Sequence, residues 1–235
     1  MTFSWRRVSA IFIKDYKDFS RNFAVSSVLF VSPILAAFYG RMGVDSIETK
    51  YMIFNMTFVM VAAFVQCCLI AEETEKNTLR GLMLSPASTA EILSGKTLLS
   101  FLFTIFSIAL SAFLLDYHPK NIGIVGAAII LSALFYLGLG TLLGMYAKSV
   151  MEASVLILPF MIVFSFGTFV TALAEKYPIL KAAEYLPNVQ LLEIAKNVEN
   201  NAGFADVLLN LGVIAIWIIV ISALTVVVFR KRMVD

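Results

Sequence analysis

The sequence predicts an all-α membrane protein with six transmembrane helices. Hydrophobic residues make up 60% of the 235 residues and charged residues only 14%, and the mean hydropathy is +0.89. These values lie far outside the range of soluble domains. Apolar runs near the roughly 20 residues that cross a bilayer recur at 23–40, 52–71, 97–115, 123–146, 153–173 and 207–229. We therefore treat 1–235 as one membrane domain, and a net charge of +2 does not suggest nucleic acid as a partner.

Residues 1–21 form a candidate amphipathic helix before the first span. Apolar side chains recur at steps of three and four residues, at Trp5, Val8, Phe12, Tyr16 and Phe19. Charged side chains follow the same rhythm on another face, at Arg7, Lys14, Asp18 and Arg21. This pattern is typical of an interfacial helix that lies flat among lipid headgroups. A basic leader to the first span is the alternative.

Basic side chains fall unevenly on the two sides of the predicted spans. Cytoplasmic segments carry the excess of lysine and arginine. One side holds twelve of them: Arg6, Arg7, Lys14, Lys17, Arg21, Lys76, Arg80, Lys96, Lys148, Arg230, Lys231 and Arg232. The other side holds Arg41, Lys50, Lys120, Lys176, Lys181 and Lys196. We therefore expect a multi-pass protein of a plasma membrane, bacterial in origin, with both termini in the cytoplasm.

The segment 72–96 is the longest polar interruption in the first two thirds of the chain, and it is predicted to form two short helices. Pro86 lacks an N–H group and disfavours helical geometry at Ser85. Ser88 and Glu91 have the spacing of a capping box. A new helix should therefore begin near Ser88.

Three acidic residues, Glu72, Glu73 and Glu75, follow the end of the second predicted span. The helix dipole disfavours negative charge at that position. Either the helix continues past these residues or basic groups on a partner offset their charge. A solvated acidic edge is a further interpretation.

The segment resembles the cytoplasmic loop after the second membrane helix of type-2 permease subunits of ATP-binding-cassette (ABC) transporters. That loop commonly reads E-x-G-T-L-E-x-L-L-x-S-P-x-S-x-x-E-x-L-x-G-K. The matching residues are Glu75, Thr78, Leu79, Leu82, Leu84, Ser85, Pro86, Ser88, Glu91, Leu93, Gly95 and Lys96. The chain departs at Asn77, often glycine in the family, and at Arg80, often acidic. These departures bear on which ATPase the loop fits.

The resemblance implies that 72–96 is a coupling loop that docks on a separate ATPase subunit. The docking residues would be Glu75, Thr78, Leu79, Leu82, Leu84, Ser85, Pro86, Ser88 and Glu91. Two copies of that ATPase would bind ATP and Mg²⁺, and this chain would bind no cofactor. Six spans make half a transporter, so a second permease subunit, identical or different, is expected beside it in the lipid bilayer.

The segment 174–206 is predicted as a re-entrant or surface helical hairpin on the outer side. Pro178 and Pro187 delimit helical runs that are too short and too polar to span. In the second run Leu191, Leu192, Ala195 and Val198 face one way, and Glu193, Lys196 and Glu199 face another. The hairpin would cap the outer end of the bundle.

Polar side chains recur on the second and fifth predicted spans. Asn55 and Gln66 are eleven residues apart, which returns them to one face at 100° per residue, and Ser154 and Ser165 repeat the spacing. Because polar groups facing lipid are costly, both faces should meet protein or a water-accessible path. Interhelical hydrogen bonding is one interpretation. The resemblance favours a translocation path, lined by Asn55, Phe58, Ala62, Gln66, Phe164, Ser165, Thr168 and Phe169.

Glycine and proline residues within the spans predict how the helices pack. Gly140 and Gly144 form a G-x-x-x-G pattern that lets helix backbones approach closely, and we expect it to act within one subunit rather than in a dimer. Pro33 and Pro159 should kink their spans, with neighbouring groups satisfying the freed carbonyls.

Two catalytic signatures fail on inspection. Ser94-Gly95-Lys96-Thr97 imitates the end of a phosphate-binding loop, but Ala90 stands where that motif needs glycine and no strand precedes it. His118 is the only histidine and falls in a predicted outer loop, so no histidine-based metal site or acid–base pair can form within the membrane. We therefore expect a non-enzymatic chain.

These observations predict the permease subunit of an ABC exporter. No ionisable residue lies in mid-membrane, where ion-driven carriers usually keep one, so an external energy source is expected. The aromatic interior favours a hydrophobic or amphipathic cargo such as a peptide toxin, an antimicrobial peptide, a drug or a lipid. A nucleotide-independent carrier or a membrane scaffold is the alternative.

Overall fold

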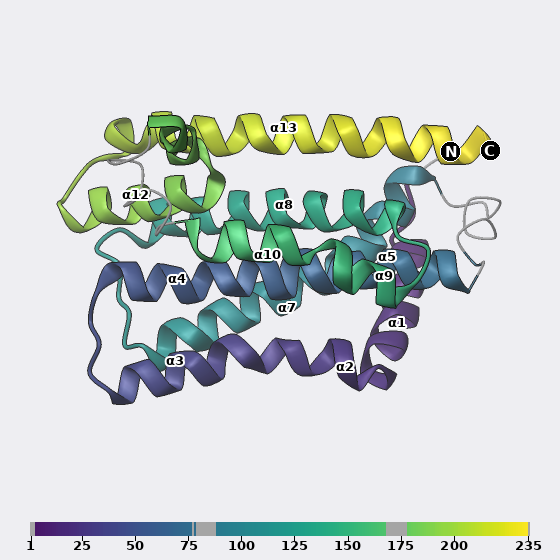
Figure 1. Cartoon of the computed structure of the whole chain (residues 1–235), viewed down its shortest axis with the longest axis horizontal. Helices are drawn as coiled ribbons and strands as arrows, with labels where there is room; N and C mark the ends of the chain where they lie inside the picture. Colours follow the sequence, from purple (N-terminus) through teal and green to yellow (C-terminus); the bar gives the residue numbers. More distant parts are fainter. Residues whose placement is uncertain (1–2, 77, 79–87, 168–177, 235) are drawn as a thin grey trace.

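The computed structural model describes residues 3–76, 78, 88–167 and 178–234, and all the regular structure in these ranges is helical. In the described part of the chain, five helices are long and apolar enough to cross a membrane: Phe23–Arg41, Ile47–Glu75, Glu91–Leu114, Ile122–Tyr146 and Phe204–Phe229. They match the first four predicted spans and the last one. They lie side by side along the long axis of the molecule (Figure 1).

The predicted fifth span corresponds to two shorter helices, α9 (Val150–Leu156) and α10 (Leu158–Ser165). They are separated at Ile157, two residues before Pro159, as expected where a proline removes a helical hydrogen bond. The apolar stretch Val150–Ser165 is shorter than a full span. The end of the predicted span, 168–173, lies outside the described residues, so a sixth crossing stays a prediction.

The first span consists of α2 (Phe23–Ser26), a 3-10 turn (Ser27–Phe30) and α3 (Val31–Arg41). The irregular turn lies just before Pro33, which has no N–H to offer the carbonyl of Leu29 four residues earlier. The hydroxyl of Ser107 on the third span donates to that carbonyl at 3.3 Å. A neighbouring helix thus satisfies the carbonyl freed by this proline, as predicted, whereas the kink itself stays a prediction.

The second span is the most buried one and contains α4 (Ile47–Thr57), a π-helix (Phe58–Val65) and α5 (Gln66–Glu75). It packs against α8 (Ile122–Tyr146). A Cβ atom on Gly140 would lie 2.3 Å from the carbonyl oxygen of Ala63, and one on Gly144 would lie 2.6 Å from that of Cys67. The G-x-x-x-G pattern therefore packs two helices of the same chain together, as predicted.

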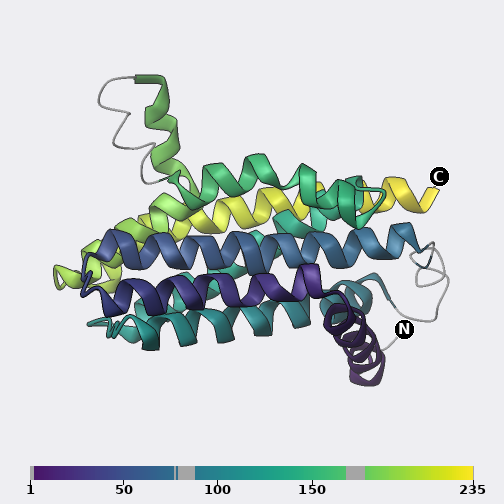
Figure 2. The ribbon, with the colours of Figure 1, turned by 60° about the horizontal axis from the view of Figure 1, so that its bottom comes forward.

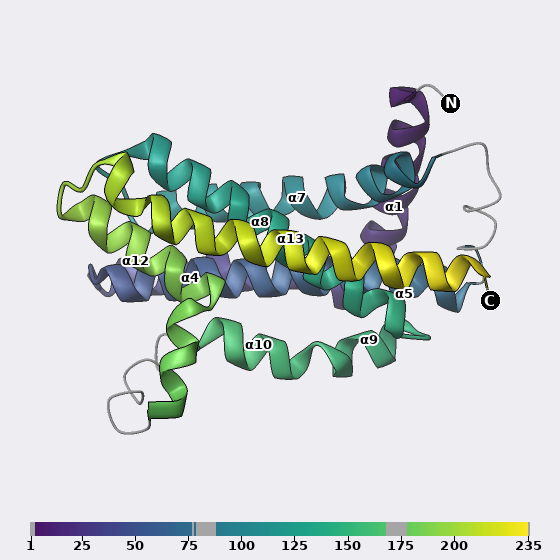
Figure 3. The same ribbon diagram turned by 90° about the horizontal axis from the view of Figure 1, so that it is seen from above.

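The amphipathic helix α1 (Trp5–Arg21) lies across one end of the bundle (Figures 2 and 3). It packs against the first turns of α7 (Thr89–Leu114). The residues it buries are Val8, Ile11, Asp15 and Phe19, whereas Trp5 and Tyr16 are exposed. The face that contacts the bundle is thus rotated from the aromatic face predicted for the lipid interface. Both termini lie at this end (Figure 1).

The opposite end carries the 3-10 segment η3 (Pro178–Tyr185), α12 (Pro187–Glu199) and the start of α13 (Phe204–Val234). η3 projects from the side of the bundle (Figure 3). α12 packs against α13, α8 and α4. Its predicted apolar face is confirmed, because Leu191, Leu192, Ala195 and Val198 are all buried. Whether the segment 174–206 re-enters the membrane stays a prediction.

Candidate functional site

The predicted coupling loop lies at the end of the bundle that α1 crosses. Its residues Leu79, Leu82, Leu84, Ser85 and Pro86 lie outside the described residues. The described candidates are Glu75 and Thr78 before the gap and Ser88 and Glu91 after it. They belong to the two flanks of the loop, the end of α5 and the start of α7.

Glu91 begins α7 and also holds α1. The Ser88 hydroxyl accepts from the Glu91 amide at 3.3 Å, and a Glu91 carboxylate oxygen accepts from the Ser88 amide at 2.6 Å. The predicted capping box is therefore confirmed. The other carboxylate oxygen accepts from the backbone N–H of Ser4 at 2.6 Å, and Arg7 forms an ion pair with Glu91 at 3.2 Å. Since Glu91 is fully buried by these contacts, it joins two helices of this chain.

A second ionic contact, one turn and a half along α7, joins α7 to both α1 and α5. The Lys96 ammonium is fully buried and lies 3.2 Å from the carboxylate of Asp15 on α1 and 2.9 Å from that of Glu73 on α5. Lys14 also pairs with Glu73, and the Thr78 hydroxyl donates to the second carboxylate oxygen of Glu73. We call Lys14, Asp15, Glu73, Thr78 and Lys96 the charged junction. It fastens both flanks of the loop to α1.

The three glutamates at the end of the second span all have partners within this chain. α5 continues through Glu75, which is the first arrangement that the sequence allowed. Glu73 is neutralised by Lys14 and Lys96, and Glu72 pairs with Lys76 at 2.6 Å. A carboxylate oxygen of Glu75 accepts from the backbone N–H of Val150 at 2.8 Å. The acids therefore have partners in the described residues without a second protein.

Burial and neighbouring charges alter the pKa values of the two charged-junction residues on α1, Lys14 and Asp15. It raises the pKa of Asp15 from its ordinary 3.8 to about 6, although Lys96 and Lys14 favour the charged form. The pKa of Lys14 is raised as well: its partial burial acts against this, but the hydrogen bond and charge of Glu73 and the charges of Asp15 and Asp18 outweigh it. Asp15 is thus half protonated near pH 6.

The two amides of the second span are buried and bonded to different neighbours. The Asn55 amide donates to the carbonyl of Asn188 on α12 at 3.3 Å. Gln66 donates to the hydroxyl of Thr141 on α8 at 3.0 Å and accepts from that of Ser100 on α7 at 2.9 Å. The π-helix between them winds more residues into each turn than an α-helix does. The rotation of 100° per residue therefore does not hold across the π-helix. The eleven-residue spacing of Asn55 and Gln66 alone does not show that they share a face.

The remaining described path residues lie inside the bundle. Phe58 and Ala62 are fully buried, and Phe164 and Ser165 nearly so. The Phe58 ring stacks on that of Tyr136 with centroids 5.4 Å apart. Thr168 and Phe169 lie outside the described residues. In one copy of the chain these side chains thus contact protein, and a path through them stays a prediction.

Sequence reasoning missed Asp15, Glu73 and Lys96 as a group. Asp15 lies in the stripe Val8, Ile11, Asp15, Phe19, at helical spacing, so a carboxylate on an otherwise apolar stripe was the available signal. Gly95 was the second available signal in the sequence. A Cβ atom there would lie 2.8 Å from the Cβ of Ile11 on α1, so the Gly-Lys pair of a false phosphate-binding loop marks a helix crossing instead.

The apolar bundle, with a charged junction at one end, defines a multi-pass helical membrane protein. Residues 23–227 match the model of a known family, described as ABC-2 family transporter protein. Since this match covers most of the chain, the protein belongs to the ABC-2 family. It is a membrane permease subunit of an ABC transporter and is not itself catalytic. A search of curated proteins found no match.

Proposed function

We propose that this chain is the permease subunit of an ABC exporter that moves a hydrophobic or amphipathic cargo. Membership of the ABC-2 family supports a transport role. Within the described part of the spans, the buried polar groups away from the ends are amides and hydroxyls, such as Asn55, Gln66 and Thr141. The buried ion pairs of Lys96 lie at the end instead. Two ATPase subunits would thus supply the energy.

The contacts of the charged junction support the proposal that the loop 72–96 transmits movement. One flank is held through Glu73 and Thr78, and the other through Lys96. Because Lys96 contacts Asp15 as well, a displacement of the loop by an ATPase would act on α1, α5 and α7 together. These three helices would then move as one rigid unit and not through a flexible linker.

The finer features of the transporter are part of the same proposal. Both termini and the loop would lie in the cytoplasm, where the ATPases are. A second permease, identical or different, would complete the path, with Asn55, Phe58, Ala62, Gln66, Phe164, Ser165, Thr168 and Phe169 as its lining. The segment 174–206 would gate the outer end. The cargo would be a peptide toxin, an antimicrobial peptide, a drug or a lipid.

Isolation of the tagged chain from its native membranes in mild detergent tests the proposal. We expect co-purification of an ATPase with a complete phosphate-binding loop. Leu82→Glu should reduce its recovery at least fivefold, because a charge would enter the apolar docking contact. Met42→Glu, in an exposed turn at the opposite end, is the control and should leave recovery unchanged.

Two outcomes would contradict the proposal in different ways. Equal recovery of the ATPase with both variants would show that the loop is not the docking element. An abundant chain without any ATPase would favour the nucleotide-independent carrier or scaffold. Glu91 is unsuitable as a docking probe, since its replacement would break the cap of α7 and the contact with α1.

A further inference from the structure

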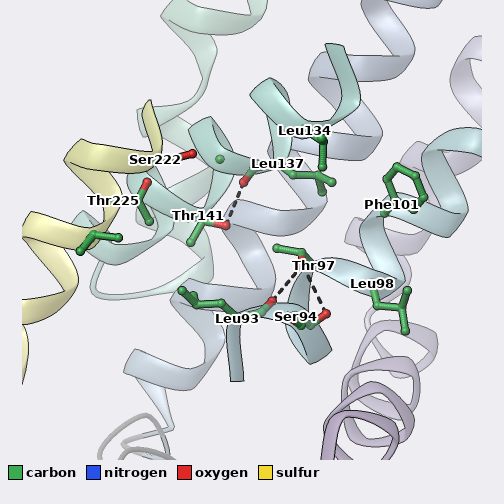
Figure 4. A pocket seen from close by; sticks show the side chains of 12 residues that line it. Leu93, Ser94, Thr97, Leu98, Phe101, Leu134, Leu137, Thr141, Ser222 and Thr225 are labelled. Atoms are coloured by element: carbon green, nitrogen blue, oxygen red, sulfur yellow. Dashed lines mark hydrogen bonds between the residues drawn. The ribbon is translucent and has the colours of Figure 1, made fainter. Parts of the chain in front are cut away.

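A groove of about 390 Å³ opens between α7, α8 and α13 (Figure 4). Its walls include Phe101 on α7, Leu134 and Leu137 on α8 and Val226 on α13, and most of the lining surface is apolar. Leu134 and Val226 are each 45% exposed. The groove is thus open on the outside of the bundle, beside three of the helices long and apolar enough to cross a membrane.

Five hydroxyl groups line this groove, and they fall into two kinds. Those of Thr97, Thr141 and Thr225 donate to carbonyls of their own helices. Ser94 and Ser222 are exposed to the groove and have no side-chain hydrogen bond within the described residues. Both hydroxyls are therefore available to donate to a polar partner that enters the groove from outside.

The groove lies in the half of the bundle nearer both termini, since it is formed by the start of α7 and the later turns of α8 and α13 (Figure 1). In the described part of the chain, that end carries eleven basic residues against seven acidic ones, which are Asp15, Asp18, Glu72, Glu73, Glu75, Glu91 and Glu152. Three basic positions, Arg230, Lys231 and Arg232, follow Phe229 on the last turns of α13. The charge at this membrane surface therefore favours anionic headgroups.

We propose that the groove is a binding site for one anionic phospholipid. An acyl chain lies between α7, α8 and α13, the glycerol ester oxygens accept hydrogen bonds from Ser94 and Ser222, and the phosphate lies at the basic end of α13. Lipid tails already sit in an apolar medium, so burial of the chain alone adds little affinity. The hydrogen bonds and the headgroup charge must then decide which lipid is retained. This lipid is a resident ligand and not the exported cargo.

Native mass spectrometry of the full chain in mild detergent, titrated with phosphatidylglycerol or phosphatidylcholine, tests the proposal. We expect one lipid per chain, with phosphatidylglycerol retained at least threefold better. Leu134→Trp fills the groove and should reduce retention at least fivefold, and Ser222→Trp is a second variant if the first does not fold. Leu209→Trp is the control, because Leu209 is 74% exposed on α13 at the opposite end.

A separate variant tests the preference for an anionic headgroup. Replacement of Arg230, Lys231 and Arg232 by glutamine should make the retention of the two lipids equal. Unchanged retention in the groove-filling variants, or equal retention of both lipids by the unaltered chain, would overturn the proposal.

A second copy of this chain is the rival occupant of the groove. It predicts that Ser222→Cys forms disulfide-linked dimers in native membranes, and this result would also overturn the lipid site. The natural cysteines, Cys67 and Cys68, are buried and would not contribute to the cross-link.

Discussion

The Nζ atom of Lys96 lies 2.9 Å from a carboxylate oxygen of Glu73, and both side chains are almost completely removed from solvent. Lys96 stands eight residues into the helix that follows the proposed coupling loop, and Glu73 stands near the end of the helix that precedes it. This single contact closes the loop at its base. Asp15 extends the contact to α1.

Lys96→Met should lower the free energy of unfolding by about 3–5 kcal/mol, the usual cost of removing one partner from a buried ion pair. Asp15 and Glu73 would then share only Lys14, which is partly exposed. Thermal unfolding in detergent measures the effect. Lys148→Met, at an exposed position on the same end, is the matched control. A Glu73→Gln/Lys96→Met double variant should regain part of the loss, and no recovery would mean that the pair is not coupled.

Asp15 predicts a specific pH dependence of stability. Its pKa is about 6 in the folded protein against 3.8 ordinarily, so the folded state binds a proton between pH 6 and 4 that the unfolded state does not. Acidification from pH 7 to pH 5 should therefore stabilise the natural chain relative to Asp15→Asn, toward a limit of about 3 kcal/mol below pH 4. The difference in melting temperature between the two proteins, followed across this range, cancels the shared carboxylates. A constant difference would contradict the assignment.

Gly140→Ala should destabilise the bundle by about 1–3 kcal/mol or more, because its new methyl group would enter the backbone of the second span. The Cβ position is 2.3 Å from the carbonyl oxygen of Ala63. Gly126→Ala, on the same helix with no atom within 4 Å of its Cβ, should instead be neutral or gain up to about 1 kcal/mol of helix propensity. Chemical unfolding of both variants in detergent distinguishes them, and equal effects would contradict the packing described here.

Gln66→Leu should cost about 1 kcal/mol of stability, since two interhelical hydrogen bonds of about 0.6 kcal/mol each are lost. The partners are Thr141 and Ser100. Steric-trapping measurements in bicelles can resolve this loss, with Met60→Leu as a volume-conserving control on the same span. If Gln66 lines the path, cargo export should fall far more than stability, and an unaltered stability would show that the hydrogen bonds contribute little.

The sequence predicted the helices better than their contacts. Apolar length determines a span, and so 23–40, 52–71, 97–115, 123–146 and 207–229 each correspond to a helix. The capping box at Ser88 is a local signal of the same kind. The π-helix Phe58–Val65 contains neither proline nor glycine and packs against α8, and no local sequence pattern predicts it.

The charged junction could not be predicted for a related reason. Asp15, Glu73 and Lys96 are separated by tens of residues, and each has an ordinary role in its own segment. Their meeting depends on the angle at which α1 crosses α7, which Gly95 permits through contact with Ile11. The crossing angle is a property of the tertiary structure. In the sequence, these three residues look only like the charges that usually flank membrane spans.

The contact between Asp15 and Lys96, 81 positions apart, also has a consequence for biosynthesis. At about 5–20 residues per second, a ribosome needs roughly 4–16 s to reach Lys96 after it has added Asp15. During that interval the first helix lacks its main packing partner, α7, and two complete spans precede that partner in the chain. The N-terminal segment is therefore a late addition to the fold although it is the first part of the chain to be made.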